Sequence, residues 1–287
     1  MWNAIAQQIS QKIGQPFEVR DRRSVGGGSI NQAYAISDGE QTFFLKLNQA
    51  SQVAMFEREA LGLKEIADSH TIRAPRPLCW GTADSSAYVV MEWLDLGAGN
   101  NQAWQKMGQQ LAAMHRVESD RGFGWHQNNT IGSTPQPNPW TADWLAFYQE
   151  HRLHYQFQLA KRRGGHFPQA GALLSALPEL LAGHDPRPAL VHGDLWSGNA
   201  AITAAGEPVL LDPAVYYGDR EVDIAMSELF GGFPAAFYQS YNEAYPLESG
   251  YSRRKVLYNL YHILNHFNLF GGGYGAQASR MIDQLLG

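Results

Sequence analysis

Residues 190–199 read Leu190-Val191-His192-Gly193-Asp194-Leu195-Trp196-Ser197-Gly198-Asn199. Two apolar residues lead into a polar loop that presents Asp194 and, five positions later, Asn199. A second apolar stretch, Val209-Leu210-Leu211, ends in another carboxylate, Asp212. Phosphoryl transfer needs one carboxylate that accepts the proton of the attacking hydroxyl, and an Asn and a second carboxylate that hold Mg²⁺. Asp and Asn are also common in turns, but the complete set favours phosphoryl transfer over an ordinary turn.

The composition describes a weakly charged, acidic chain. Its 287 residues include 22 Lys+Arg and 27 Asp+Glu, which gives a formal net charge of −5. Hydrophobic residues make up 44%, enough for a sizeable core, and at about 150 residues per domain the length fits one large domain or two smaller ones. The acidic balance argues against a surface that binds nucleic acid or a membrane.

The single cysteine bears on the compartment. Cys79 alone excludes an intramolecular disulfide and a cysteine-rich metal site, which favours a reducing compartment. The first residues lack the charged and apolar regions of a signal peptide, and no apolar run reaches the length of about 20 residues that a membrane helix needs. We therefore expect a cytoplasmic protein without a membrane or nucleic-acid partner. Its oligomeric state is not indicated.

The first 93 residues are predicted to be rich in strands. Apolar residues at spacings of three and four predict helices, alternating patterns predict strands, and the Asp38-Gly39 pair is typical of a hairpin turn. The predicted helices cover residues 2–13 and 51–67, and the predicted strands cover residues 32–36, 42–47 and 87–91.

From residue 102 onward the pattern becomes helical. A polar segment at residues 123–140 is long enough to be either functional or mobile. We therefore predict two domains, 1–93 and 94–287, joined near Glu92–Leu96, with the ligand site between them. The later helical stretches are predicted near residues 140–162, 221–230, 234–245 and 251–269.

These motifs resemble those of the kinase-like phosphotransferases, which include protein kinases, aminoglycoside phosphotransferases and choline kinases. The superfamily pattern His-x-Asp-x-x-x-x-Asn is matched by His192, Asp194 and Asn199. The longer string His-Gly-Asp-Leu-Trp-Ser-Gly-Asn, with Tyr-Gly-Asp-Arg-Glu-x-Asp-x-Ala-Met after it, resembles the fructosamine/ketosamine 3-kinase family. This similarity covers nearly the whole chain. It implies an α+β, protein-kinase-like fold of two lobes, the N-terminal lobe β-rich and the C-terminal lobe mainly helical.

The resemblance also implies roles in the N-terminal half. Lys46 lies on the second predicted hairpin strand, where kinases place the lysine that contacts the α- and β-phosphates of ATP. A helix glutamate should orient it, and Glu57 and Glu59 are both candidates. Two residues apart on a helix, they point about 200° apart, so only one of them can face Lys46. The family pattern favours Glu59, whereas without the downstream motif a solvated charged face would be the preferred interpretation of this helix.

The glycine run at Gly26, Gly27 and Gly28 precedes the hairpin that carries Lys46. Such a run is often only a flexible turn, but glycine also lets the backbone approach phosphates closely. Its position favours a loop that covers the phosphates of ATP. In the segment that resembles the kinase hinge, the carbonyl of Glu92 and the amide of Leu94 are the groups expected to bind adenine.

Three further residues have two interpretations each. Trp196, beside Asp194, could stack on a sugar ring or simply pack. Asp219 and Asp223 begin a predicted helix. They would either cap the N-terminus of that helix or brace the catalytic loop, by which we mean residues 192–199.

The resemblance implies an ATP-dependent kinase for the 3-hydroxyl of ketosamines, such as fructosyl- or ribulosyl-lysine, free or on glycated proteins. MgATP would bind between the lobes, with Lys46 on its phosphates, Asn199 and Asp212 on Mg²⁺, and Asp194 as the catalytic base. The unstable product would release the amine, which is deglycation.

Two alternatives remain. One is a related kinase for an aminoglycoside, choline or another amino-alcohol, and the other is a catalytically silent, kinase-like binding protein. The loop string Leu195-Trp196-Ser197-Gly198, together with Asp212-Pro213-Ala214, favours the ketosamine branch. The silent protein is disfavoured because every expected catalytic position is filled.

Overall fold

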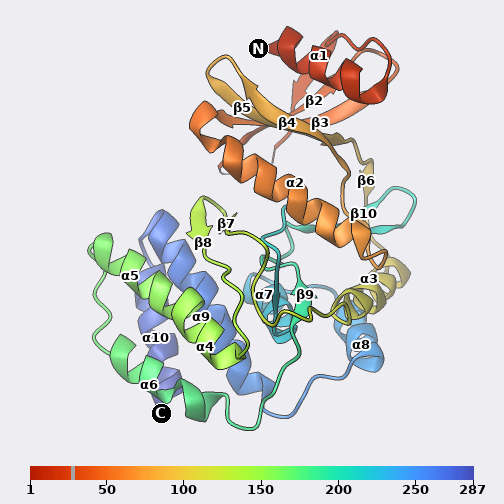
Figure 1. Ribbon diagram of the computed structural model, residues 1–287. Coiled ribbons are helices and arrows are strands. Elements are labelled where there is room, and N and C mark those ends of the chain that lie inside the picture. The colour runs from red at the N-terminus through yellow and green to blue at the C-terminus, as the bar shows by residue number, and fades with distance from the viewer. Residues whose placement is uncertain (27–29) are drawn as a thin grey trace. The chain divides into compact units, whose positions relative to one another are not determined.

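The computed structural model describes residues 1–26 and 30–287 (Figure 1). The chain divides into two compact units, each built from two segments. The first unit comprises Met1–Ala103 and Gly198–Pro213, and the second comprises Trp104–Ser197 and Ala214–Gly287. This division differs from the predicted boundary between residues 93 and 94, chiefly because Gly198–Pro213 belongs to the first unit.

The first unit contains a five-stranded antiparallel sheet with the strand order β1-β2-β3-β5-β4. Its strands are β1 (Asp21–Ser24), β2 (Gln32–Ser37), β3 (Thr42–Gln49), β4 (Pro77–Ala83) and β5 (Ser86–Glu92). A smaller sheet pairs β6 (Leu96–Gly97), β10 (Ala200–Thr203) and β11 (Pro208–Leu210). The helices are α1 (Trp2–Ile13), the 3₁₀ turn η1 (Ala50–Gln52) and α2 (Val53–Asp68). These bounds confirm the predicted helices, hairpin and strands of the N-terminal half.

The alternation of β3 places one charged side chain opposite the apolar ones. Successive side chains of a strand point to opposite faces of the sheet. Leu45 and Leu47 belong to an apolar core together with Ile5 and Ile9 of α1, whereas Lys46 points to the face covered by α2. Figure 1 shows α1 and α2 on these opposite faces.

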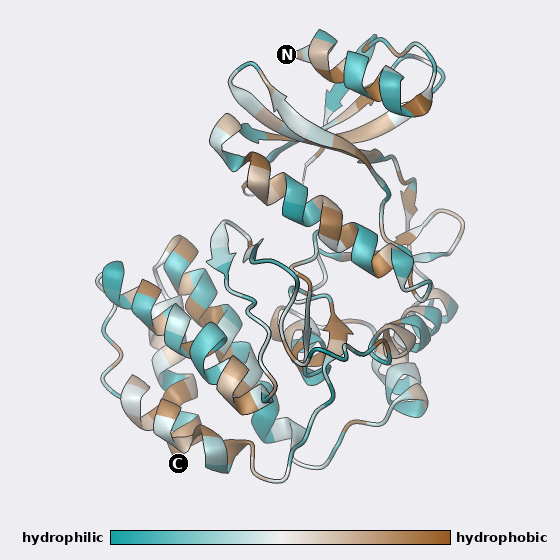
Figure 2. Ribbon diagram, in the orientation of Figure 1, coloured by the Kyte–Doolittle hydropathy of each residue, from teal (hydrophilic) through white to brown (hydrophobic). Residues whose placement is uncertain are grey.

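The helix α2 turns one side of its surface toward the sheet. Hydrophobic residues recur along it between hydrophilic ones (Figure 2). Glu57 is exposed, whereas the side chain of Glu59 is only 11% exposed. The helical repeat therefore separates the two glutamates, as their spacing predicts. The buried residues of α2 are Met55, Phe56, Ala60, Gly62, Leu63 and Ile66.

The second unit is mainly helical. Its helices are most of α3 (Asn101–Met114), α4 (Trp144–Tyr148), the π-helix η2 (Gln149–His154), α5 (Tyr155–Arg162), α6 (Ala170–Leu180), α7 (Glu221–Leu229), α8 (Ala235–Ala244), α9 (Tyr251–Phe270) and α10 (Tyr274–Leu286). Two short ladders pair β7 (Asn129–Ile131) with β8 (Thr134–Gln136), and β9 (Ala189–Val191) with β12 (Tyr216–Gly218). The predicted helical stretches correspond to α3, α4 with α5, α7, α8 and α9, whereas the pattern did not predict α6 and α10.

The polar segment at residues 123–140 lies partly in the interior of the second unit. It contains the β7–β8 hairpin, and its amide side chains Asn129, Gln136 and Asn138 are 5%, 1% and 1% exposed. Buried amides must find hydrogen-bond partners, so this segment is held by specific contacts. None of the helices in the described part of the chain combines the length and apolar character that a membrane crossing requires.

Candidate active site

Lys46 lies between two carboxylates of the first unit. Its Nζ donates a hydrogen bond to Oε1 of Glu59 at 2.7 Å and a second one to Asp212. The Lys46 side chain is only 8% exposed. Burial alone would lower the pKa of Lys46, but the charges of Asp212 and Glu59 outweigh burial and raise it. The ammonium group is therefore permanently charged and fixed in place.

Asp212 has an unusual backbone for a residue with a side chain. Its φ is 51°, in the left-handed region that few non-glycine residues adopt. Its side chain is 51% exposed although it pairs with Lys46. Backbone conformations of this kind cluster at functional sites. One carboxylate can thus contact the lysine and still face solvent.

Asn199 and Asp212 together fit a magnesium ion. The backbone carbonyl of Asn199 accepts the N–H of Leu211 at 2.8 Å, which places Asn199 beside the residue that precedes Asp212. Carboxylate and amide oxygens are the ligand types that Mg²⁺ prefers. The backbones of the predicted pair are therefore close to each other within the first unit, and binding of Mg²⁺ by the two side chains stays a prediction.

The glycine run is only partly described. Gly26 is exposed, and a Cβ atom there would meet nothing within 4 Å. Gly27 and Gly28 lie outside the described residues. A role of this loop on the phosphates of ATP stays a prediction.

The two predicted hinge residues lie at the end of β5, with Glu92 as its last residue and Leu94 two positions later. The N–H of Glu92 donates to the carbonyl of Arg76 at 2.9 Å, and its side chain accepts the N–H of Arg76 at 3.0 Å. Its other carboxylate oxygen accepts a bond from Arg73 at 3.3 Å. Leu94 is half-buried. Adenine binding by the two backbones stays a prediction, but the Glu92 carboxylate fixes the end of β5.

In the second unit, the loop after β9 presents Asp194. His192 is fully buried, whereas Asp194 is half-buried. Gly193 between them has φ +81°, and a Cβ atom there would collide with the carbonyl group of Ala214. This position therefore requires glycine for both its conformation and its close approach to Ala214.

Asp223 holds the backbone of this loop. Its carboxylate accepts the N–H of His192 at 2.6 Å and the N–H of Gly193 at 2.8 Å, and it contacts Nε2 of His115 at 3.1 Å. Burial alone would raise the pKa of Asp223, but its bonds to His115 and to the loop lower it below its usual range. Of the two interpretations given to Asp223, bracing of the catalytic loop is the one that the contacts support.

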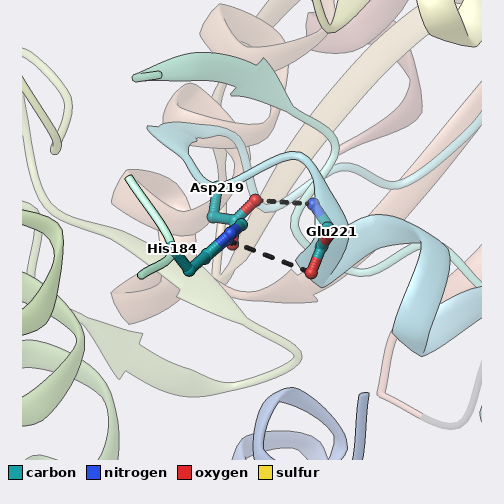
Figure 3. A group of neighbouring side chains, drawn as sticks. All are labelled: His184, Asp219 and Glu221. Carbon is teal, nitrogen blue, oxygen red and sulfur yellow. Dashed lines mark hydrogen bonds and ion pairs between the residues drawn. The ribbon is translucent and has the colours of Figure 1, made fainter. Parts of the chain in front are cut away.

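Asp219 belongs to a different group of buried charges, with His184 and Glu221 (Figure 3). One potential ligand atom of each residue lies within 4.8 Å of the others, a spacing that a metal ion would tolerate. Each carboxylate, however, already has strong partners. Tyr258 donates to Asp219 at 2.5 Å, and Arg254 donates two bonds to Glu221 at 2.7 and 2.9 Å. Because the guanidinium supplies the positive charge, we interpret the group as an ion-pair network.

His184 contacts two carboxylates of this network. Its Nε2 lies 2.6 Å from Asp219, and its Nδ1 lies 2.8 Å from Glu248. Burial alone would lower the pKa of His184, but these carboxylates raise it. Asp219 also accepts the N–H of Glu221 at 3.0 Å, so capping of α7 is the interpretation that fits Asp219.

Trp196 is one of the exposed large side chains of the second unit, with 37% of its surface accessible. Its ring meets that of Phe230 edge-on, with centroids 6.4 Å apart, and Phe230 in turn lies 4.9 Å from His266. An accessible aromatic ring two residues from Asp194 suits stacking on a sugar. That role stays a prediction.

Known proteins match this chain over its full length. The family model described as Fructosamine kinase matches residues 1–287. The chain is 60% identical to a probable ketoamine kinase of Synechocystis sp., with 99% of this chain and 97% of the relative covered. It is 43% identical to a chloroplastic protein-ribulosamine 3-kinase of Arabidopsis thaliana, with 95% of this chain and 85% of the relative covered.

Solved structures show the same fold. A protein of Haemophilus somnus assigned as a fructosamine-3-kinase has a TM-score of 0.94 at 31% identity, covering 100% of this chain and 98% of that one. A mutant aminoglycoside phosphotransferase, crystallised with AMP-PNP and hygromycin B, has a TM-score of 0.67 at 18% identity, covering 99% and 98%. The second likeness concerns the fold alone. The predicted kinase-like α+β fold class is confirmed.

Proposed function

This chain belongs to the fructosamine kinase family, and on that basis we propose that it transfers the γ-phosphoryl group of ATP to the 3-hydroxyl of a ketosamine. The acceptors would be fructosyl- or ribulosyl-lysine, free or on a glycated protein. The observation that carries the proposal is Lys46, a buried ammonium held by Glu59 and Asp212. A fixed cation beside a half-exposed carboxylate is what the phosphates of a Mg²⁺-bound nucleotide require.

The first unit would bind the nucleotide. Lys46 would contact the α- and β-phosphates as a point charge, while Glu59 keeps it from moving. Asn199 and Asp212 would hold Mg²⁺ through their side-chain oxygens. Bound Mg²⁺ neutralises negative charge on the phosphate oxygens.

The second unit would supply the base. Asp194 would accept the proton of the substrate's 3-hydroxyl as its oxygen bonds to the γ-phosphorus. The bond from that phosphorus to the bridging oxygen of ADP breaks, and ADP leaves with the electron pair. Asp223 would keep the loop under Asp194 in one conformation through its bonds to His192 and Gly193. The 3-phosphorylated ketosamine would then release its amine, so the outcome is deglycation.

Two observations favour ketosamines as acceptors. The curated relatives that match over nearly the full chain are named for ketoamines and ribulosamine. The aminoglycoside phosphotransferase shares only the fold, at 18% identity. The cytoplasmic location that the sequence predicts stays a prediction.

A substrate panel tests the proposal. Purified protein with MgATP is offered fructosyl-lysine, ribulosyl-lysine, a glycated protein, choline and kanamycin, and ADP release is followed by a coupled assay. We expect turnover with at least one ketosamine, its loss on chelation of Mg²⁺, and release of free lysine afterwards. Preference for choline or kanamycin would overturn the proposed acceptor, and failure to bind MgATP would favour the silent protein.

A further inference from the structure

Gln136, the last residue of β8, uses its whole side-chain amide in the interior of the second unit. Its Nε2 donates to Oδ1 of Asn129 at 2.8 Å and to the carbonyl of Ala214 at 3.0 Å. Its Oε1 accepts the hydroxyl of Tyr261 at 2.7 Å. Both N–H groups and the oxygen thus have partners, so the amide can take only one orientation.

Ala214 is also in direct contact with the start of the catalytic loop. The N–H of Ala214 donates to the carbonyl of His192 at 2.9 Å. A Cβ atom at Gly193 would collide with the Ala214 carbonyl. Gly193 therefore contacts the Ala214 carbonyl, which is the group that accepts the bond from Gln136. A shift of Ala214 would move the start of the loop.

Further bonds fix Gln136 and the neighbouring backbone. Asn129 donates to the carbonyl of Val215 at 2.8 Å and accepts a bond from Asn138 at 2.8 Å. Arg152, in the π-helix η2, donates to Oδ1 of Asn138 at 2.7 Å. Arg152 is fully buried, with its guanidinium 4.1 Å from the ring centroid of Tyr216. A buried cation thus anchors the amides that hold residues 214 and 215.

The same network reaches the neighbourhood of Asp194. Burial raises the pKa of Tyr261, and the charge of Asp194 adds to the effect. Tyr261 on α9 is therefore within electrostatic range of Asp194 while its hydroxyl orients Gln136.

We propose that Gln136 is a positioning residue for phosphoryl transfer, which fixes Ala214 and through it the loop segment His192–Gly193 that presents Asp194. The inference rests on the proposed function, because the effect of positioning is read as turnover. Asp223 holds the amide groups of this segment, and Gln136 supports it from the side of Ala214. The loop is thus held by two elements that are distant in sequence.

Three variants test the inference. Gln136→Met keeps the approximate volume and removes the amide, and we expect kcat to fall about 10- to 100-fold, because small displacements of a reacting group have effects of this size. Tyr261→Phe removes only the bond that orients Gln136, and we expect kcat to fall about 3- to 10-fold. In both, KM for ATP stays within about twofold, since Lys46, Glu59 and Asp212 are untouched.

Tyr148→Phe is the matched control. Tyr148 is also buried in the second unit and donates to the carbonyl of Leu257 at 3.0 Å, with no bond to Gln136 or Ala214. A purely structural role would lower the melting temperature of Tyr261→Phe and Tyr148→Phe alike and leave kcat per folded molecule unchanged. A folded Gln136→Met with wild-type kcat, or equal kcat for the two Tyr→Phe variants, would overturn the inference.

A readout independent of activity separates this inference from the proposed function. In protein labelled with ¹⁵N-glycine, the amide resonance of Gly193 should move in Gln136→Met and Tyr261→Phe and stay in place in Tyr148→Phe. An unmoved Gly193 resonance in the first two contradicts positioning whatever the substrate is. If the resonance moves as expected while no ketosamine is phosphorylated by the wild type, the proposed function fails and the positioning contact stands. Should Gln136→Met not fold, Tyr261→Phe decides.

Discussion

The two units hold their chemical groups by different means. In the first, Lys46 is fixed by the side-chain charges of Glu59 and Asp212. In the second, Asp194 stands on a loop whose backbone N–H groups are held by a buried carboxylate, Asp223. An ion-pair cluster suits a site that must bind a charged ligand, and a braced backbone suits a base that must meet one hydroxyl. Changes in the first unit should therefore alter ATP affinity, and changes in the second should alter turnover.

The largest effect is expected at Asp194. Asp194→Asn keeps the shape of the side chain and removes the base, so kcat should fall by about 10²–10⁴. ATP binding should persist because the nucleotide contacts that we propose belong to the first unit. Steady-state kinetics with the best ketosamine measures the first quantity, and thermal shift with MgATP measures the second. Near-wild-type turnover would show that Asp194 is not the base.

Asp223→Asn tests whether bracing of the loop controls turnover. An amide has one oxygen where the carboxylate accepts the N–H groups of both His192 and Gly193, and its NH₂ would face a donor. We expect kcat to fall about 10- to 100-fold and the free energy of unfolding to fall by about 1–3 kcal/mol, the cost of an unsatisfied buried group.

The control for Asp223→Asn is Asp143→Asn, the same substitution at a residue that caps the N-terminus of a helix. Asp143 accepts the N–H of Ala146 at 2.7 Å at the start of α4, and Asn caps helices about as well as Asp. Asp143→Asn should change neither kcat nor stability. A rise in KM for ATP in Asp223→Asn, with unchanged kcat, would break the contrast between the two units.

Glu59→Gln tests the first unit. The amide can still accept a bond from Lys46 at the observed distance of 2.7 Å, but it no longer supplies a charge. Loss of a charge-assisted bond of about 1.5 kcal/mol or more would raise KM for ATP about tenfold, with a smaller change in kcat. Glu57→Gln, on the exposed side of the same helix, is the matched control and should leave both constants unchanged. Equal effects of the two substitutions would remove Glu59 from the site.

Groups that carry chemistry along a short stretch of chain could be predicted from the sequence. Asp194 and Asn199 lie in one motif, and Lys46 follows a hairpin signal. Helical geometry requires Glu57 and Glu59 to face different ways, and the structure pairs Glu59 with Lys46. Their catalytic roles stay predictions, but their placement follows from local spacing.

Groups that hold a backbone could not be predicted in this way. Gln136 and Ala214 are 78 positions apart, and Asp223 and His192 are 31 apart, so no local pattern connects them. The left-handed backbone of Asp212 depends on its surroundings in the fold and has no sequence signature.

Two helices, α6 and α10, are also not predicted from the sequence. The helix α6 contains Pro178, which lacks an N–H group and normally ends a helix. The helix α10 follows a run of three glycines, Gly271–Gly273, which the pattern indicates as a loop. Neither signal prevents the helix, because Pro178 lies near the C-terminal end of α6 and the three glycines precede α10.

The smallest effect is expected at His184, and it concerns stability alone. His184 bonds Asp219 and Glu248, which raises its pKa above the usual value of about 6.5. The stability that its charge contributes is therefore fully present below pH 6.5 and is lost as the pH rises through the raised pKa. His184→Gln should lower the melting temperature by about 2–4 °C near pH 6 and by less near pH 9.

Circular-dichroism melts of both proteins at the two pH values measure this difference. His154→Gln is the control, because His154 and its partner Glu150 are 41% and 59% exposed, and exposed pairs contribute little. The turnover of folded His184→Gln should equal that of the wild type, since His184 bonds Asp219 and Glu248, whereas Asp223 holds the backbone of the loop. A drop in kcat would mean that the ion-pair network also supports the catalytic loop. In that case the second unit, like the first, would depend on charge for its chemistry.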